Sequence, residues 1–167
     1  MIEKSDIGKS APQGLGGWLV LVGFGLLFSP LRLISHLLST YPPLFTDGAW
    51  DALTSPSSGA YVPFWAPLLG FEILGNVLLF IAGLVLIALF FQRSPRFPPT
   101  YIGISIASFL FILGDAWLVS LVLPDEPMFD PETTRELARS FVNLVVWVPY
   151  LLISKRVRNT FSQTVVG

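Results

Sequence analysis

Residues 64–91 read FWAPLLGFEILGNVLLFIAGLVLIALFF, an almost unbroken apolar run that contains one formal charge, Glu72. About 20 consecutive apolar residues cross a bilayer as an α-helix, so this run predicts a tilted membrane span. Three further runs have the same character, and the four predicted spans cover about residues 14–38, 64–91, 99–123 and 137–153. The predicted fold is therefore all-α: a polytopic membrane protein whose four transmembrane helices form one bundle.

The composition agrees with that fold and excludes several classes of function. Hydrophobic residues make up 53% of the chain and charged residues only 13%, which is outside the range of ordinary soluble domains. A net charge of -1 argues against nucleic acid as a partner. The chain has no cysteine, one histidine and two methionines, so few soft metal ligands exist. We expect no metal and no other cofactor, and the lipid bilayer is the expected partner.

The distribution of lysine and arginine predicts the orientation. Basic residues precede the first span, lie between the second and third, and follow the fourth: Lys4, Lys9, Arg93, Arg96, Lys155, Arg156 and Arg158. Cytoplasmic loops are enriched in lysine and arginine, so both termini are predicted to be cytoplasmic. The chain then divides into a cytoplasmic tail at 1–13, one transmembrane domain at 14–161 and a second cytoplasmic tail at 162–167.

Two features are predicted in the outer loops. Residues Thr46 to Leu53 are compatible with two turns of helix capped by Thr46, and an irregular loop is the alternative. The sequence Asp130-Pro131-Glu132 indicates the start of the fourth helix more firmly. It combines an N-cap residue, a proline at the first helical position and an acid in the first turn. We expect this helix to begin in water and to enter the bilayer near Leu137.

Each of the four apolar runs carries one formal charge, and a rise of about 1.5 Å per residue places all four in the outer leaflet. A charge at this depth is costly unless it is paired or hydrated, so it indicates a functional or structural site. Polar residues three or four positions away share the same helix faces. The candidate cluster is Arg32, His36, Glu72, Asn76, Asp115, Arg139 and Asn143.

Two interpretations of this cluster remain open. In the structural one, the two cations and two anions cancel and fix the order of the helices. In the functional one, they line a cavity that is open to the outside and bind a polar ligand, ion or lipid headgroup. In either case we expect Glu72 to pair with Arg32, with Asp115 and either Arg139 or Asn143 completing the cluster. His36 is expected to be an interfacial polar residue, with haem or chlorin ligation as the alternative.

No motif indicates catalysis. The glycine-rich strings at 14–17 and 23–25 lack the strand–turn–helix context of a nucleotide site, and they are better explained by close helix packing. No nucleophile–base set can be assembled from the remaining residues. We therefore predict a protein that is not an enzyme, with no catalytic residues.

Several local strings occur together in a recognisable order. They are Gly16-Gly17-Trp18-Leu19, Ser29-Pro30-Leu31-Arg32, Phe71-Glu72-Ile73-Leu74-Gly75-Asn76, Arg96-Phe97-Pro98, Trp147-Val148-Pro149-Tyr150 and the tail from Ser154 to Phe161. In these strings the chain resembles the bacterial inner-membrane family catalogued as domain of unknown function 2569. The resemblance covers about residues 14–161 and implies a small four-helix inner-membrane protein with both ends cytoplasmic. It implies no catalytic residues.

These observations predict a multi-pass protein of the bacterial cytoplasmic membrane. The preferred function is a non-enzymatic accessory or assembly subunit that packs its apolar helix faces against a larger inner-membrane complex. The alternative is a binding or transport protein that uses the charged cluster for a polar ligand, ion or lipid headgroup.

Overall fold

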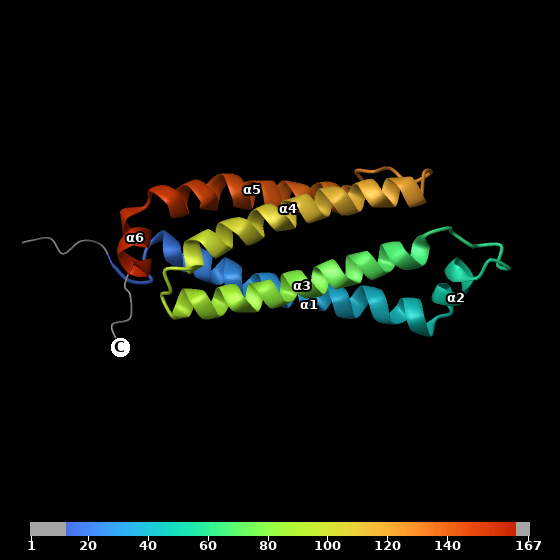
Figure 1. Cartoon of the computed structure of the whole chain (residues 1–167), viewed down its shortest axis with the longest axis horizontal. Helices are drawn as coiled ribbons and strands as arrows, with labels where there is room; N and C mark the ends of the chain where they lie inside the picture. The colour runs from blue at the N-terminus through green and yellow to red at the C-terminus, as the bar shows by residue number, and fades with distance from the viewer. Residues whose placement is uncertain (1–12, 163–167) are drawn as a thin grey trace, which may run out of the picture.

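A computed structural model describes residues 13–162, and it is helical with no strand in that range. All but one residue of each predicted tail, 1–13 and 162–167, lie outside the described residues. The helices are α1 (Trp18–Thr46), α2 (Ala49–Thr54), α3 (Trp65–Phe91), α4 (Phe97–Val122), α5 (Pro131–Ile153) and α6 (Lys155–Phe161), as drawn in Figure 1. Of these, α1, α3, α4 and α5 are long and apolar enough to cross a membrane. The predicted all-α fold with four membrane-length helices is confirmed.

Helices α3 and α4 begin and end within two residues of the predicted spans. Helix α1 is longer than predicted, because it continues past Leu38 and through Pro42 and Pro43 to Thr46. Proline fixes φ near the helical value, so a chain can pass through prolines in a last turn and lose only their N–H groups. This extension carries Tyr41 into the bundle, where its side chain is buried.

The start of α5 is as predicted. Asp130 is the N-cap, its Oδ1 accepts a hydrogen bond from the backbone N–H of Thr133 across 2.6 Å, and Pro131 is the first helical residue. The short outer helix also exists, but it begins at Ala49 after Gly48, which adopts a left-handed conformation and provides no side-chain cap. Thr46 instead ends α1, and its hydroxyl donates to Asp47. The predicted Thr46 cap is therefore wrong.

The four long helices form two antiparallel hairpins, α1 with α3 and α4 with α5, and the hairpins contact each other through α3 and α4. Figure 1 shows that both described chain ends lie at one end of the molecule. We call this the terminal end, formed by residues 14–17, the turn 92–96 and α6. The opposite end, formed by α2 and residues 123–130, is the loop end. The hairpins lie close together at the terminal end and diverge towards the loop end (Figure 1).

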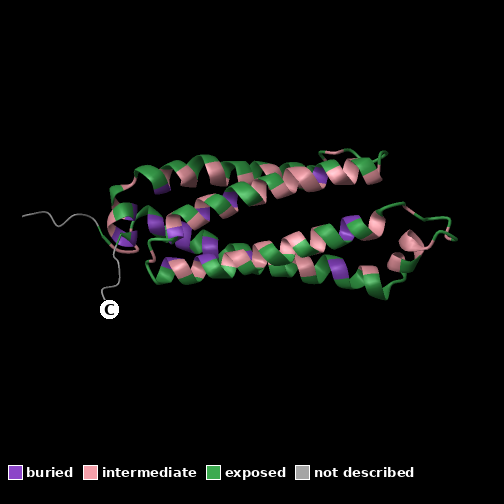
Figure 2. Cartoon of the chain, viewed as in Figure 1, coloured by how far each residue is buried: buried purple, intermediate pink, exposed green. Residues whose placement is uncertain are grey.

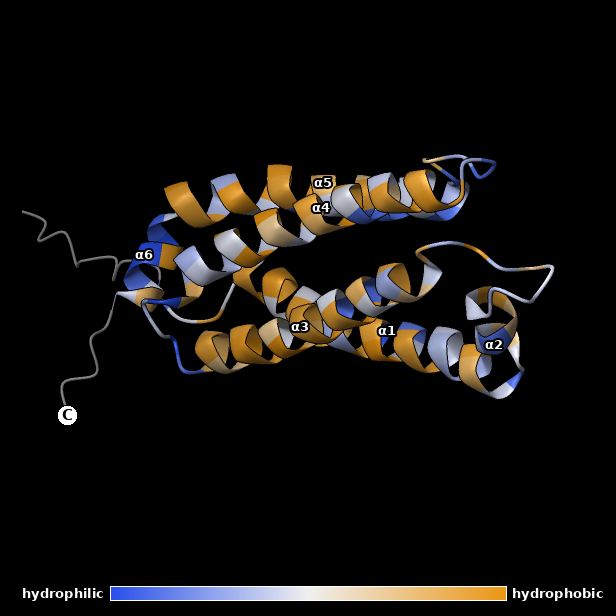
Figure 3. Cartoon of the chain, turned by 45° about the vertical axis from the view of Figure 1, so that its right-hand side comes forward, coloured by the Kyte–Doolittle hydropathy of each residue, from blue (hydrophilic) through white to orange (hydrophobic). Residues whose placement is uncertain are grey.

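The hydrophobic core reflects that arrangement. Its buried side chains gather at the terminal end (Figure 2), where α6, which was not predicted, packs across the bundle. Phe161 of α6 stacks on Phe97 with ring centroids 4.8 Å apart and lies 6.0 Å from Phe90. Between the two polar ends the helices carry mostly apolar side chains (Figure 3), and many of these are exposed. An exposed apolar face of this length is suited to contact with lipid tails or with other membrane helices.

Candidate functional site

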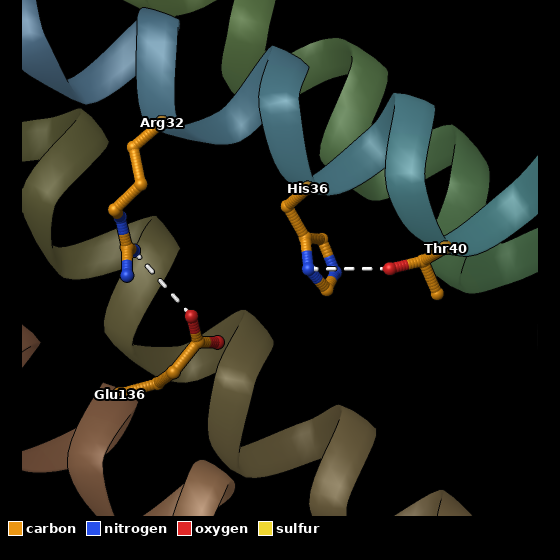
Figure 4. A network of polar contacts seen from close by, with 4 residues as sticks. All are labelled: Arg32, His36, Thr40 and Glu136. Atoms are coloured by element: carbon orange, nitrogen blue, oxygen red, sulfur yellow. Dashed lines mark hydrogen bonds and ion pairs between the residues drawn. The ribbon is translucent and has the colours of Figure 1, made fainter.

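The cation of the first span pairs with a residue that the sequence did not suggest. Arg32 on α1 and Glu136 on α5 point towards one another (Figure 4), with 3.4 Å between Arg32 Nη2 and Glu136 Oε1. This is the one ion pair among residues 13–162, so the predicted pair of Arg32 with Glu72 is wrong. The side chains remain 57% and 38% exposed, respectively. The ion pair therefore links the two hairpins without being enclosed by either.

Glu72 on α3 is held by α1 in a different way. Its Oε1 accepts a hydrogen bond from the hydroxyl of Tyr41 across 2.7 Å. Asn76, one turn further along α3, donates its Nδ2–H to the same hydroxyl across 3.2 Å. Tyr41 therefore acts as donor and acceptor at once, which fixes the rotation of α1 against α3. The predicted shared face of Glu72 and Asn76 is confirmed, and their partner is a residue that the sequence placed outside the span.

Asp115 on α4 lies near two other acids, Glu72 of α3 and Glu136 of α5. Electrostatic repulsion from both Glu72 and Glu136 acts on its carboxyl group. Its Oδ1 is buried and has no hydrogen-bond partner among residues 13–162. A buried carboxyl oxygen without a partner is costly, so native structures rarely leave one. Asp115 is thus the least satisfied polar group of the predicted cluster.

The two candidates on α5 separate from this layer. Asn143 lies within the α4–α5 hairpin, where its Oδ1 accepts from the hydroxyl of Tyr101 across 2.8 Å and its Nδ2–H donates to Ser105 Oγ across 3.2 Å. Asn143 therefore joins two helices and does not complete the charged cluster. Arg139 is exposed and forms no ion pair with any residue in the described range. The prediction that one of these two residues completes the charged cluster is therefore wrong for residues 13–162.

His36 lies one turn from Arg32 towards the loop end. Its side chain is partly buried, and its Nδ1 lies 3.4 Å from the hydroxyl of Thr40 (Figure 4). Its ring also meets that of Tyr41 edge-on. Both contacts fit an interfacial polar residue. Within residues 13–162, no group of three acid, histidine or cysteine side chains is arranged to hold a metal ion.

The molecule also has two apolar hollows at the depth of the bilayer. One of about 560 Å³ lies between α1 and α3 and is lined by side chains such as Phe28, Phe80 and Leu84. The other, of about 310 Å³, lies between α3 and α4, where the small residues Gly75, Ala82 and Ala107 leave space. All of their lining residues are apolar, so both hollows suit acyl chains or a neighbouring apolar helix.

Comparison with known proteins gives one family. The family model described as "Protein of unknown function (DUF2569)" matches residues 12–162. The chain belongs to this family. No curated protein and no solved structure matches it. Membership of DUF2569 thus agrees with a bundle of membrane-length helices, and it assigns no role to the polar layer.

The polar layer, as the structure has it, consists of Arg32, Tyr41, Glu72, Asn76, Asp115 and Glu136. Sequence reasoning missed Tyr41, because the two prolines after it indicated a loop, and it missed Glu136, because this residue lies just before the predicted span. A signal for Glu136 did exist: it is three residues before Arg139 and shares its helix face.

Proposed function

We propose that this DUF2569 protein is a non-enzymatic accessory or assembly subunit of a larger complex in the bacterial cytoplasmic membrane. One observation carries the proposal: the part of the polar layer between the two hairpins, formed by Arg32, Asp115 and Glu136, is not fully satisfied by residues 13–162. Within residues 13–162, Asp115 Oδ1 is buried without a hydrogen-bond partner, and the Arg32–Glu136 pair is half-exposed at membrane depth. A partner helix that brings a hydrogen-bond donor to this layer would remove both costs.

The packing of the hairpins supports the same proposal. Their shared core lies at the terminal end, and towards the loop end the contact between them weakens. Ala82 and Ala107 line the hollow between α3 and α4, so a neighbouring helix can approach this surface closely. The partner that fits is a membrane helix with an amide, hydroxyl or basic side chain about 10 Å below its loop-side end.

The test is purification of the tagged full-length chain from its native membrane in a mild detergent, followed by mass spectrometry of the retained molecules. We expect an integral membrane protein in a fixed ratio to the chain. Asp115→Ala should lose it, because alanine offers no side-chain oxygen to the hydrogen-bond donor of the partner. Leu121→Ala on the same helix should retain it, because that side chain is 59% exposed away from the core. Equal retention by both variants contradicts the proposal.

The alternative, a binding or transport protein for a polar ligand, is supported by the electrostatics of the layer. Glu72 and Glu136 both lie close enough to Asp115 for their charges to repel its carboxyl group, and Arg32 is the one cation of the layer, so the layer favours a ligand that supplies positive charge. The same purification separates the two functions. A lone protein that carries a positively charged small molecule or lipid, and loses it on Glu136→Gln, would establish the alternative in place of the accessory role.

A further inference from the structure

Charge is separated along the length of the molecule. Every acidic residue in the described range lies on α2, in the loops of the loop end, or on the loop-side parts of α3, α4 and α5: Asp47, Asp51, Glu72, Asp115, Asp125, Glu126, Asp130, Glu132 and Glu136. The charged residues of the terminal end in that range are all basic: Arg93, Arg96, Lys155, Arg156 and Arg158. None of these five forms an ion pair with a described residue. The terminal end is therefore a cationic surface whose counter-charge the described chain does not supply.

Aromatic packing brings two distant segments of this surface together. Arg96 directly precedes Phe97, and the Phe97 ring stacks on Phe161 of α6 at 4.8 Å. Arg93 lies three residues after Phe90, whose ring also contacts that of Phe161. Helix α6 buries Val157 and Phe161 against the bundle. The turn 92–96 and α6 thus lie side by side and bring their basic residues to the same end of the molecule, although about 60 positions separate them in the chain.

A third segment positions one of the basic side chains. The guanidinium of Arg156 lies directly over Gly16 and Gly17, and a Cβ added at Gly16 would lie 2.8 Å from Arg156 Nη1. Thr160 of α6 also donates a hydrogen bond to the carbonyl of Gly14 across 3.3 Å. Residues 14–17 therefore hold α6 in place and leave Lys155 and Arg158 exposed on its other side.

The basic surface lies at the depth where a bilayer changes from acyl chains to headgroups. Arg93 follows the last residue of α3 by two positions, Arg96 precedes the first residue of α4, and Lys155 follows the last residue of α5 by two. Four of the five side chains are exposed there. Basic groups at this depth bind anionic lipid headgroups, with each cation contributing to the affinity.

We propose that the turn 92–96 and α6 together form a binding site for the phosphate of an anionic phospholipid. The site is separate from the polar layer and does not depend on the accessory role. Its ligand is recognised by net negative charge: the five cations offer no described acid to the ammonium group of a zwitterionic lipid. Exposed Arg96, Lys155 and Arg158 provide the phosphate contacts, and Gly16 allows Arg156 to support them from beneath.

The experiment uses the full-length protein in a neutral detergent and compares phosphatidylglycerol with phosphatidylcholine of the same acyl chains. Native mass spectrometry measures the bound lipid and its dissociation constant. We expect phosphatidylglycerol to bind preferentially, and Arg158→Gln to weaken it about five-fold, as expected for the loss of one surface cation. Arg135→Gln is the matched control, because it removes an equally exposed arginine at the loop end and should leave binding unchanged.

Three results would overturn the proposal. Equal affinity for the two lipids, or equal effects of Arg158→Gln and Arg135→Gln, would show that the basic surface does not select anionic headgroups. Dissolved inorganic phosphate that displaces the lipid at equal concentration would show that the ligand is a free anion. Because Arg158 is exposed, its replacement by glutamine preserves the fold, which the thermal unfolding midpoint of the variant verifies.

Discussion

Glu72 is fixed in place by a hydroxyl group from another helix. Tyr41 donates to its Oε1 across 2.7 Å, and Asn76, one turn further along α3, donates to the tyrosine oxygen. In a bilayer no water competes for these groups, so one removed partner leaves another unsatisfied. The same logic applies to Asn143, which binds Tyr101 and Ser105 between α4 and α5. Individual polar side chains therefore determine how neighbouring helices are rotated.

We expect Glu72→Ala to destabilise the folded protein by about 1–3 kcal/mol, because it removes a charged acceptor from a partly buried hydroxyl. Thermal unfolding in detergent measures the effect. Glu72→Gln keeps an acceptor oxygen and should cost less. Leu74→Ala, at a 59% exposed position of the same helix, is the control for shortening a lipid-facing side chain. A harmless Glu72→Ala would contradict the assigned role of Glu72.

Glycine 75 allows the close approach of α3 and α4. A Cβ added there would overlap the ring of Phe111, whereas a Cβ at Gly70 of the same helix meets nothing within 4 Å. We expect Gly75→Ala to destabilise the protein by about 1–3 kcal/mol through overpacking. Gly70→Ala should be neutral or stabilising by up to about 1 kcal/mol, because alanine has the higher helix propensity. Unfolding midpoints in detergent test the pair, and equal shifts would exclude the close contact.

At the level of single residues, the sequence predicts which residues belong to the polar layer better than it predicts their partners. Arg32, Glu72 and Asp115 stand out because each is a lone charge in an apolar run. Which residue each one meets depends on the rotation and tilt of the helices. Helices α3 and α4 are apolar on nearly all sides, so the sequence pattern does not indicate which face meets a neighbour. For this reason the sequence did not indicate that Arg32 pairs with Glu136 and not with Glu72.

At the level of elements, helix boundaries follow local signals. Asp130 marks the start of α5 because its side chain satisfies a free N–H of the first turn. Helix α6 has a comparable signal, since Ser154 accepts from the N–H of Val157 and Val157 and Phe161 lie one turn apart on its buried side. Its seven residues are too few for hydropathy to detect. The helix is stable because it packs on Phe97, and such a contact between distant segments is not visible in the local sequence.

The cap of α5 predicts a pH dependence. The hydrogen bonds from Thr133 lower the pKa of Asp130 below its usual value, so the carboxylate contributes stability above the unfolded-state pKa. That contribution is lost as the pH falls through the lowered folded-state pKa. We expect Asp130→Ala to lower the unfolding midpoint at neutral pH. In acid, the difference between the midpoints of the variant and the wild type should become smaller. Asp130→Asn retains a cap without the charge, so its deficit should be smaller at neutral pH. A gap that does not change with pH would contradict the role of the carboxylate.

At the level of the whole molecule, the packing is uneven. The terminal end has a continuous core of aromatic and aliphatic side chains from α1, α3, α4, α5 and α6, while the hairpins diverge towards the loop end. The four-helix fold was predictable, because apolar length alone identifies membrane helices. The divergence was not, because it depends on the core that α6 completes and on the polar layer that keeps charged groups between the hairpins. The surface that we propose for a partner lies where the chain packs least tightly against itself.

The uneven distribution of charge also leads to a prediction about topology. Both described chain ends lie at the basic terminal end, and the acidic residues lie towards the loop end. Because cytoplasmic segments are enriched in lysine and arginine, we expect the terminal end to be cytoplasmic. Alkaline phosphatase fused after Gly59 should be active, since the enzyme functions only outside the cytoplasm, and green fluorescent protein fused after Gly167 should fluoresce. Exchanging the two reporters is the control, because both signals should then disappear. Reporters that place the two positions on the same side would refute the four-span topology.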